Sequence, residues 1–289
     1  MKYSILKYGS AIRGNSDKYS DKDLLIVAED YNVLNLLKEH YVKLGWSVSI
    51  YTYVKLKYLS TNGFLFVKHL ILEGEIIYDA GNLLHSILEN FNECIDYKSE
   101  MKKASLFLNF IQEIPDNDIS YSWLLDNIYL TFRNYLIYES ALKKEYNFGY
   151  IDLVKNLLLE GRINQNEAEK LLQLRVVKSC YRNNFDDITP SKEFAKVVIS
   201  IVNRIGLKIT TSFTPKNLKL YNFDFNNIDS AYKKLRLIEL ILKNESIEDQ
   251  YLNKCISNPQ MYASNKSIER IYLKVLEKLK TSHNIVLAK

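Results

Sequence analysis

The first part of the chain changes its hydrophobic period repeatedly. Residues 23–28 (DLLIVA) are a continuous apolar run, typical of a strand buried on both faces, whereas residues 46–53 (WSVSIYTY) alternate strictly, as a half-exposed strand does. Residues 31–44 carry apolar side chains at helical spacing. The pattern predicts, in order, a strand at 2–8, a strand at 23–28, a helix at 31–44, a strand at 46–53, a helix at 64–72 and a strand at 75–78. This order predicts a small α/β domain that ends near residue 82.

Beyond that point the apolar positions keep helical spacing. The expected helices lie at about 84–96, 98–112, 121–145, 150–159, 165–183, 191–206, 228–243, 246–256 and 264–281. Residues 214–227 are polar and aromatic without a clear period, as in a boundary between helical parts. We therefore expect an α+β protein, with an α/β domain at 1–82, a helical bundle at 83–213 and a C-terminal helical subdomain at 214–289.

Composition supports this division and limits the class of protein. Six of the nine glycines fall in the first 81 residues, and all four prolines come after position 114, so tight turns concentrate at the front. Hydrophobic residues make up 47% of the 289 residues and charged ones 25%, which excludes wholesale disorder. The net charge is +5, and the surplus lies in residues 214–289, which permits a nucleic-acid surface without requiring one.

Several classes of site and location are not expected. The three cysteines form no CxxC pair and no Cys/His cluster, so we expect neither a disulfide framework nor a zinc site. No signal peptide and no apolar window of membrane-spanning length is recognisable, so we expect a cytoplasmic protein without a membrane partner.

Two acidic residues begin the most apolar strand. Asp21 and Asp23 are separated by one residue, so in an extended strand their carboxylates point to the same face and repel each other. A divalent cation between them relieves that repulsion. A few hard carboxylate oxygens suit Mg²⁺, completed by water and substrate phosphates, with Mn²⁺ as the alternative ion.

The turn before this strand has features of a phosphate site. Gly9 lets the backbone approach a phosphate closely, and Ser10 can donate its hydroxyl and its backbone N–H. Arg13 follows within a few residues and adds a cationic donor for a triphosphate. The stretch therefore predicts a metal–nucleotide site.

The same stretch resembles the signature of the DNA polymerase beta-like nucleotidyltransferase superfamily, in particular the minimal nucleotidyltransferase group. The matching positions of the pattern Gly-Ser, Arg-Gly and Ser-Asp-x-Asp-Leu are Gly9, Ser10, Arg13, Gly14, Ser20, Asp21, Asp23 and Leu24. The resemblance covers roughly residues 2–80. It implies transfer of a nucleoside monophosphate from a nucleoside triphosphate to an acceptor hydroxyl. It makes Asp21 and Asp23 the catalytic metal ligands, and Gly9, Ser10, Arg13 and Ser20 the nucleotide-binding residues.

One departure from the family pattern affects the expected activity. Family members carry a third carboxylate on a later strand, but residues 46–53 contain no Asp or Glu, and Ser47 or Ser49 occupies the expected face. The nearest acids that could substitute are Glu73, Glu75 and Asp79. The alternative to an active transferase is therefore a catalytically impaired nucleotide-binding or protein-interaction module.

A second, weaker resemblance lies in the helical region. Arg133-Asn134-x-x-x-Tyr138 is similar to the Arg-polar-x-x-x-His motif of HEPN helical domains, with tyrosine in place of histidine. This replacement removes the group that titrates near neutral pH, so we do not expect RNase activity of the HEPN kind, and a degenerate RNase-type toxin is a third reading. HEPN domains often accompany minimal nucleotidyltransferases, which implies a toxin–antitoxin or phage-defence setting.

Basic side chains add candidate contacts. Arg175, Lys178 and Arg182 share one face of a predicted helix, either as a salt-bridged surface or, with Arg133, as contacts to the cleft or acceptor. A basic row on the last predicted helix, either a solvated face or a nucleic-acid contact, consists of Lys266, Arg270, Lys274 and Lys278. The expected acceptor is a protein, RNA or small-molecule hydroxyl. Neither the nucleotide, the acceptor nor the oligomeric state follows from the sequence.

Overall fold

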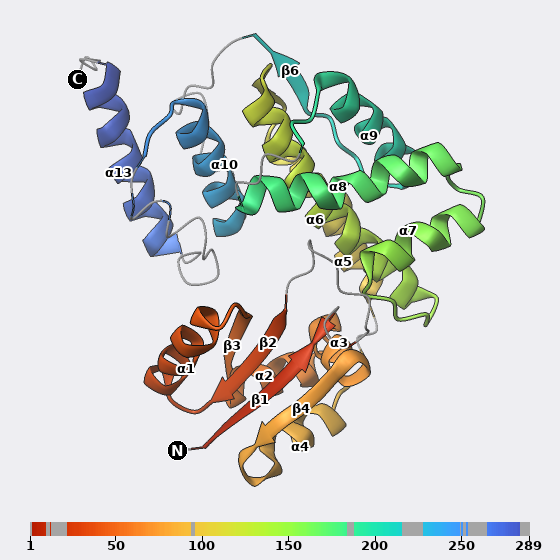
Figure 1. Ribbon diagram of the computed structural model, residues 1–289, viewed down its shortest axis with the longest axis vertical. Helices are drawn as coiled ribbons and strands as arrows, with labels where there is room; N and C mark the ends of the chain where they lie inside the picture. Colours follow the sequence, from red (N-terminus) through yellow and green to blue (C-terminus); the bar gives the residue numbers. More distant parts are fainter. Residues whose placement is uncertain are drawn as a thin grey trace. The chain divides into compact units, whose positions relative to one another are not determined.

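The structure is a computed structural model, which describes residues 2–9, 12, 22–93, 96–183, 188–215, 228–248, 250, 253 and 265–283. It is an α+β fold, in which a small four-stranded sheet is followed by a mostly helical region (Figure 1). The expected fold class is therefore confirmed.

The sheet combines parallel and antiparallel pairs. Its strands are β1 (Tyr3–Tyr8), β2 (Asp23–Ala28), β3 (Ser47–Thr52) and β4 (Gly74–Asp79), in the spatial order β3-β2-β1-β4. β1 pairs antiparallel with β2 and β4, whereas β2 and β3 are parallel. All four strands lie within about one residue of the ranges that the hydrophobic pattern predicts.

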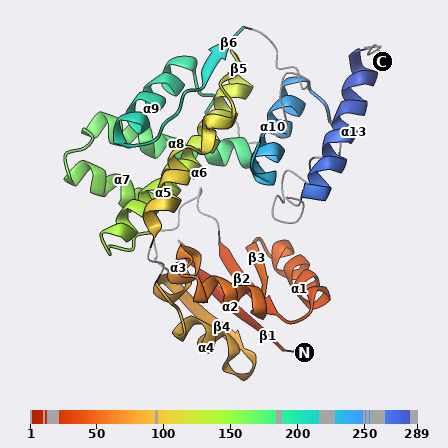
Figure 2. The same cartoon turned by 180° about the vertical axis from the view of Figure 1, so that it is seen from behind.

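Helices cover both faces of this sheet. The helix α1 (Tyr31–Lys43) packs on one face; α2 (Tyr53–Thr61), α3 (Leu65–Glu73) and α4 (Leu83–Glu89) pack on the other, with the short η2 (Ala80–Asn82) before α4 (Figure 2). The side chain of Asp30 caps α1 by accepting the N–H of Asn32 at 2.8 Å. Thr52, the last residue of β3, caps α2 in the same way, so strand and helix follow without a loop, and the sequence pattern did not predict α2.

The two faces of β2 belong to two different hydrophobic cores. Leu25 and Val27 pack with residues of α2, α3 and α4, while Leu24 and Ile26 pack against α1. This double burial is what the continuous apolar run of β2 predicts.

The remainder of the described chain is mainly helical. Its elements are α5 (Tyr97–Ser105), η3 (Phe107–Phe110), β5 (Glu113–Pro115), α6 (Asp118–Leu142), α7 (Tyr150–Leu159), α8 (Gln165–Asn183), α9 (Lys192–Ile205), β6 (Ser212–Thr214), α10 (Ala231–Asn244) and α13 (Asn265–His283). The strands β5 and β6 form a parallel pair that an all-helical region would lack. Most of the helix expected at 246–256 lies outside the described residues. No described helix is both long and apolar enough to cross a membrane.

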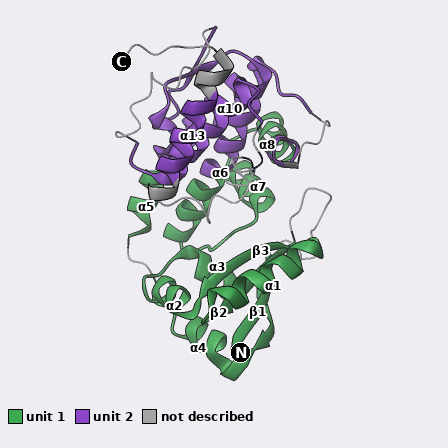
Figure 3. Ribbon diagram, turned by 90° about the vertical axis from the view of Figure 1, so that its left-hand side faces the viewer, with its two compact units in different colours: residues 1–104, 133–176 green, residues 105–132, 177–289 purple. Residues whose placement is uncertain are grey.

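The chain divides into two compact units, and each unit is assembled from separate stretches. The first comprises residues 1–104 and 133–176, and the second residues 105–132 and 177–289 (Figure 3). Two of the three divisions fall inside the long helices α6 and α8, and the third falls at the last residue of α5. The units therefore differ from the boundaries at 82 and 213 that the sequence suggests.

Candidate functional site

One end of the sheet brings Gly9 and Asp23 together. Tyr8, the last residue of β1, is the register partner of Asp23, the first residue of β2. Gly9 has a φ of +79°, and a Cβ on it would lie 2.9 Å from Asp23 Oδ2. Glycine is therefore required both by the left-handed backbone and by the close approach of the carboxylate. A carboxylate thus lies directly against the turn where the sequence predicts a phosphate.

The other expected members of the nucleotide site cannot be placed. Ser10, Arg13, Ser20 and Asp21 lie outside the described residues. Within the described part of the chain, no group of three or more His, Cys, Asp or Glu side chains could hold a metal ion. Asp23 supplies one hard oxygen ligand of the type that Mg²⁺ prefers, and the space beside Gly9 exists only because that residue has no side chain. Among the described residues, Asp23 is therefore one ligand that suits the ion.

Tyr8 and Ser49 occupy the sheet face that Asp23 shares. Ser49 is the register partner of Leu25, which lies two residues beyond Asp23 on the same face. The Tyr8 and Ser49 hydroxyls are 3.1 Å apart and hydrogen-bonded. Burial raises the pKa of the Tyr8 hydroxyl, the Asp23 carboxylate raises it further, and Ser49 and Arg133 oppose the shift. Tyr8 is therefore a neutral hydrogen-bonding group at the position beside Asp23.

The three acids that could replace the missing carboxylate occupy different places. Asp79 pairs with Ser4 at the opposite end of β1, and accepts its hydroxyl at 2.7 Å. Glu75 is the register partner of Lys7 and so faces the opposite side of the sheet from Asp23. Glu73 precedes Gly74, the partner of Tyr8, and thus lies at the same sheet end as Asp23.

The carboxylate of Glu73 is bound by a histidine. His69 Nε2 lies 2.9 Å from Glu73 Oε2, one helical turn away on α3. The His69 ring is buried between Tyr8, which it meets edge-on at a centroid distance of 5.4 Å, and Phe148, on which it stacks at 4.5 Å. No sequence pattern connects His69 to this end of the sheet, because His69 lies in an apolar helix without a motif around it.

Arg133 reaches the same group of side chains from α6. Its Nη2 donates to the carbonyl of Phe148 at 2.9 Å, and its charge acts on the Tyr8 hydroxyl. We call the group at this end of the sheet the strand-end cluster, and its members are Tyr8, Gly9, Asp23, Ser49, His69, Glu73, Arg133 and Phe148. All of them belong to the first compact unit. Of the four basic candidates named from the sequence, Arg133 is the one whose charge acts on Tyr8.

Arg182, another basic candidate, belongs to a buried ion cluster in the second unit. Its Nε and Nη2 bind the two oxygens of Asp126 at 3.0 and 2.6 Å. The Nη2 of Arg236 also binds Asp126, at 2.6 Å, and its Nη1 lies 2.8 Å from Glu239. Asp126, Arg236 and Glu239 are buried, so Arg182 pairs with a carboxylate of the helical interior. The helical spacing left open a salt-bridged surface, and Arg182 is salt-bridged, but to a buried carboxylate.

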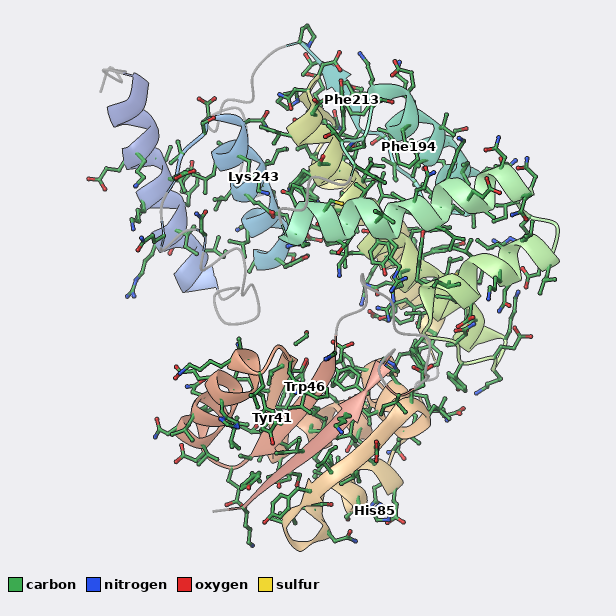
Figure 4. The ribbon with its side chains drawn as sticks, in the orientation of Figure 1. Tyr41, Trp46, His85, Phe194, Phe213 and Lys243 are labelled. Carbon is green, nitrogen blue, oxygen red and sulfur yellow. The ribbon has the colours of Figure 1, made fainter. Side chains whose placement is uncertain are left out.

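Tyr181 and Lys243 complete this buried ion cluster. The Tyr181 hydroxyl donates to Glu239 at 2.8 Å, and Lys243 Nζ lies 3.8 Å from the centre of the Tyr181 ring. Burial lowers the pKa of Lys243, which Figure 4 labels on α10. The cluster thus joins α6, α8 and α10. Charged residues inside apolar helices were the signal that could have predicted it.

The remaining sequence candidates are placed as follows. Arg175 and Lys178 are half-buried on α8, and both have interaction partners. Tyr138 is half-buried, with its ring centre 6.3 Å from that of Tyr97, whereas Asn134 is exposed. On α13, Arg270 is exposed, and the side chain of Lys266 lies outside the described part.

Comparison with known proteins adds no family. No protein-family model matches the chain, and no characterised protein is significantly similar to it in sequence.

Proposed function

We propose that the chain is a Mg²⁺-dependent nucleotidyltransferase that moves a nucleoside monophosphate from a nucleoside triphosphate to a hydroxyl group. The observation that supports this most is the contact between Asp23 and Gly9, which brings a carboxylate against a side-chain-free turn. The sequence resemblance requires that juxtaposition for a metal-bound triphosphate. In the reaction the acceptor hydroxyl loses its proton to solvent as its oxygen bonds to the α-phosphorus. The bond from the α-phosphorus to the bridging oxygen breaks, and pyrophosphate leaves with the electron pair of that bond.

In this proposal the chain's own residues position the metal ion and the phosphates of the nucleotide. Asp23, together with Asp21, holds the ion, which when bound offsets the negative charge of the phosphates. Gly9 gives the phosphates access to the backbone, and Tyr8 and Ser49 present hydroxyls beside Asp23. The acceptor is a protein, RNA or small-molecule hydroxyl, in a toxin–antitoxin or phage-defence setting.

The test is transfer of label by the full chain. Incubation with radiolabelled ATP, GTP, CTP or UTP, Mg²⁺ and cell extract is expected to label a protein, RNA or small-molecule fraction. Asp23→Asn should abolish the labelling. Glu29→Gln is the matched control, because Glu29 is an exposed acid directly after the other end of β2, and it should label normally. Equal labelling by wild type and Asp23→Asn would overturn the proposal.

A second candidate function rests on β3. The face of β3 that Asp23 shares presents Ser49, whose hydroxyl is engaged by Tyr8, and no acid stands on this strand. A site built in this way could bind a metal–nucleotide without turning it over. Isothermal titration calorimetry alongside the labelling assay separates the two candidates: Mg²⁺-dependent binding without any labelled product supports the nucleotide-binding module, and labelled product excludes it.

A further inference from the structure

Arg133 differs from the other arginines that the helices partly bury. Arg162 pairs with Glu139 at 2.6 Å, and Arg182 and Arg236 both pair with Asp126 at 2.6 Å. Arg133 is half-buried as well, but its one hydrogen bond among the described residues runs from Nη2 to the neutral carbonyl of Phe148. A guanidinium carries five N–H donors and a permanent charge. Much of the donor capacity of Arg133 is therefore not used by described groups.

A half-buried cation without a carboxylate partner is costly unless an anion joins it. Within the described residues, no carboxylate forms an ion pair with Arg133, and two acids of the same unit have other partners. Glu73 is bound by His69, and Glu139 is bound by Arg162. The position thus combines partial desolvation, which strengthens electrostatic attraction, with a positive charge that pairs with no carboxylate of the described residues.

Contacts connect this charge to Asp23. The carbonyl that Arg133 binds belongs to Phe148, whose ring stacks on His69 at 4.5 Å, and His69 meets Tyr8 at 5.4 Å. Tyr8 is the register partner of Asp23. The charges of Asp23 and Arg133 therefore both act on the Tyr8 hydroxyl, within a single compact unit. A metal-bound triphosphate has the complementary distribution, with a cation at one part of the phosphate chain and free anionic oxygens at another.

We propose that Arg133 binds the triphosphate of the nucleotide whose metal ion Asp23 holds. The inference rests on the proposed function, and it assigns the helical region a direct part in nucleotide recognition. Planar guanidinium donors bind phosphate oxygens in a bidentate manner, which makes arginine better suited than lysine to this role.

The experiment measures nucleotide affinity of the full chain by calorimetry, with Mg²⁺ and with either the triphosphates or the corresponding monophosphates. Arg133→Gln keeps a donor for the Phe148 carbonyl but removes the charge, and it should weaken triphosphate binding by about tenfold or more. Monophosphate binding should change by less than about threefold, because its shorter phosphate chain lacks the groups that Arg133 binds. Arg133→Lys should give an intermediate loss. Arg204→Gln, which changes an exposed arginine on α9, is the control and should bind like wild type.

The outcomes separate this inference from the proposed function. If Asp23 is required for transfer but Arg133→Gln, with an unchanged melting temperature, binds triphosphates normally, the inference alone fails. If triphosphate binding depends on Arg133 but no product forms, the inference stands and transfer fails. Equal weakening of monophosphate and triphosphate binding by Arg133→Gln would indicate a merely structural role and overturn the inference. A parallel titration with single-stranded RNA completes the test: a loss on Arg133→Gln that is confined to the RNA would assign the charge to an RNA backbone and would also overturn the inference.

Discussion

Asp23 Oδ2 occupies the space that a side chain on Gly9 would need, since a Cβ there would lie 2.9 Å from it. Gly9→Ala is therefore expected to do two things. It strains a backbone with φ of +79°, at a cost of about 1–2 kcal/mol, and it displaces the Asp23 carboxylate. Metal-dependent nucleotide binding should fall by about tenfold or more, measured by calorimetry alongside urea unfolding.

Gly45 provides a matched control for this change. Its φ is +82°, close to that of Gly9, but a Cβ on it would meet nothing within 4 Å. Gly45→Ala should therefore show a similar loss of stability, about 1–2 kcal/mol, and normal nucleotide binding. If both alanine variants bind nucleotide like wild type, the contact between Gly9 and Asp23 does not support a binding site.

Ser49 is the position at which a third carboxylate can be introduced. Ser49→Asp would put an acid on the sheet face that Asp23 shares, next to the Tyr8 hydroxyl, which can donate to it. We expect a higher rate of nucleotide transfer and tighter Mn²⁺ binding, because a third carboxylate ligand joins Asp21 and Asp23 at the site. Ser49→Ala, which removes only the hydroxyl, should show neither gain. If Ser49→Asp leaves both the transfer rate and the metal affinity unchanged, the missing carboxylate does not limit the activity of the site.

The sequence pattern predicted the sheet well because each strand has a distinct period. The continuous apolar run forms β2 and the alternating stretch forms β3, as predicted. The helices α1, α7 and α8 begin within one residue of their predicted starts. The helix α2 was missed because Thr52 ends a strand and caps a helix at once, so no polar break separates them. The strands β5 and β6 have three residues each, too few to show a period.

The buried ion cluster of the second unit predicts a large effect of a single substitution. Asp126→Asn leaves Arg182 and Arg236 without the carboxylate that both bind at 2.6 Å, in a buried environment. We expect the free energy of unfolding to fall by about 3–5 kcal/mol, measured by urea denaturation. Asp118→Asn, at the exposed start of the same helix, should cost less than about 1 kcal/mol. A loss of similar size in both variants would contradict the role of the cluster.

The carboxyl group of Glu93 predicts a loss of stability at low pH. Hydrogen bonds from Lys144 and then Tyr146 lower the pKa of Glu93 from 4.5 to about 2. Since the folded-state pKa is depressed, the stabilisation is present above the ordinary pKa and is lost as the pH falls towards 2. The carboxyl ¹³C shift of Glu93 should titrate in this window. Lys144→Met should move the midpoint up towards 4.5, while Lys103→Met, whose partner is Glu100, should leave it unchanged. A Glu93 midpoint near 4.5 in wild type would contradict the contact.

The candidate site was only partly predictable, because its members come from distant parts of the chain. Gly9 and Asp23 could be predicted as members of one site, because the turn and the start of the strand are close in sequence and local spacing decides which groups meet there. His69, Arg133 and Phe148 join them through packing across 61 to 140 residues from Tyr8, and no local period reports such contacts. For the same reason the partner of Arg182, 56 residues away on α6, could not be identified from helical spacing.

The most direct test of a metal-dependent nucleotide site is the comparison of wild type with Asp23→Asn in the labelling assay, with Glu29→Gln as the control. The proposal predicts Mg²⁺-dependent transfer of label by wild type and Glu29→Gln, and none by Asp23→Asn. Labelling that is the same in all three proteins, or that persists after Mg²⁺ is removed with a chelator, would contradict it.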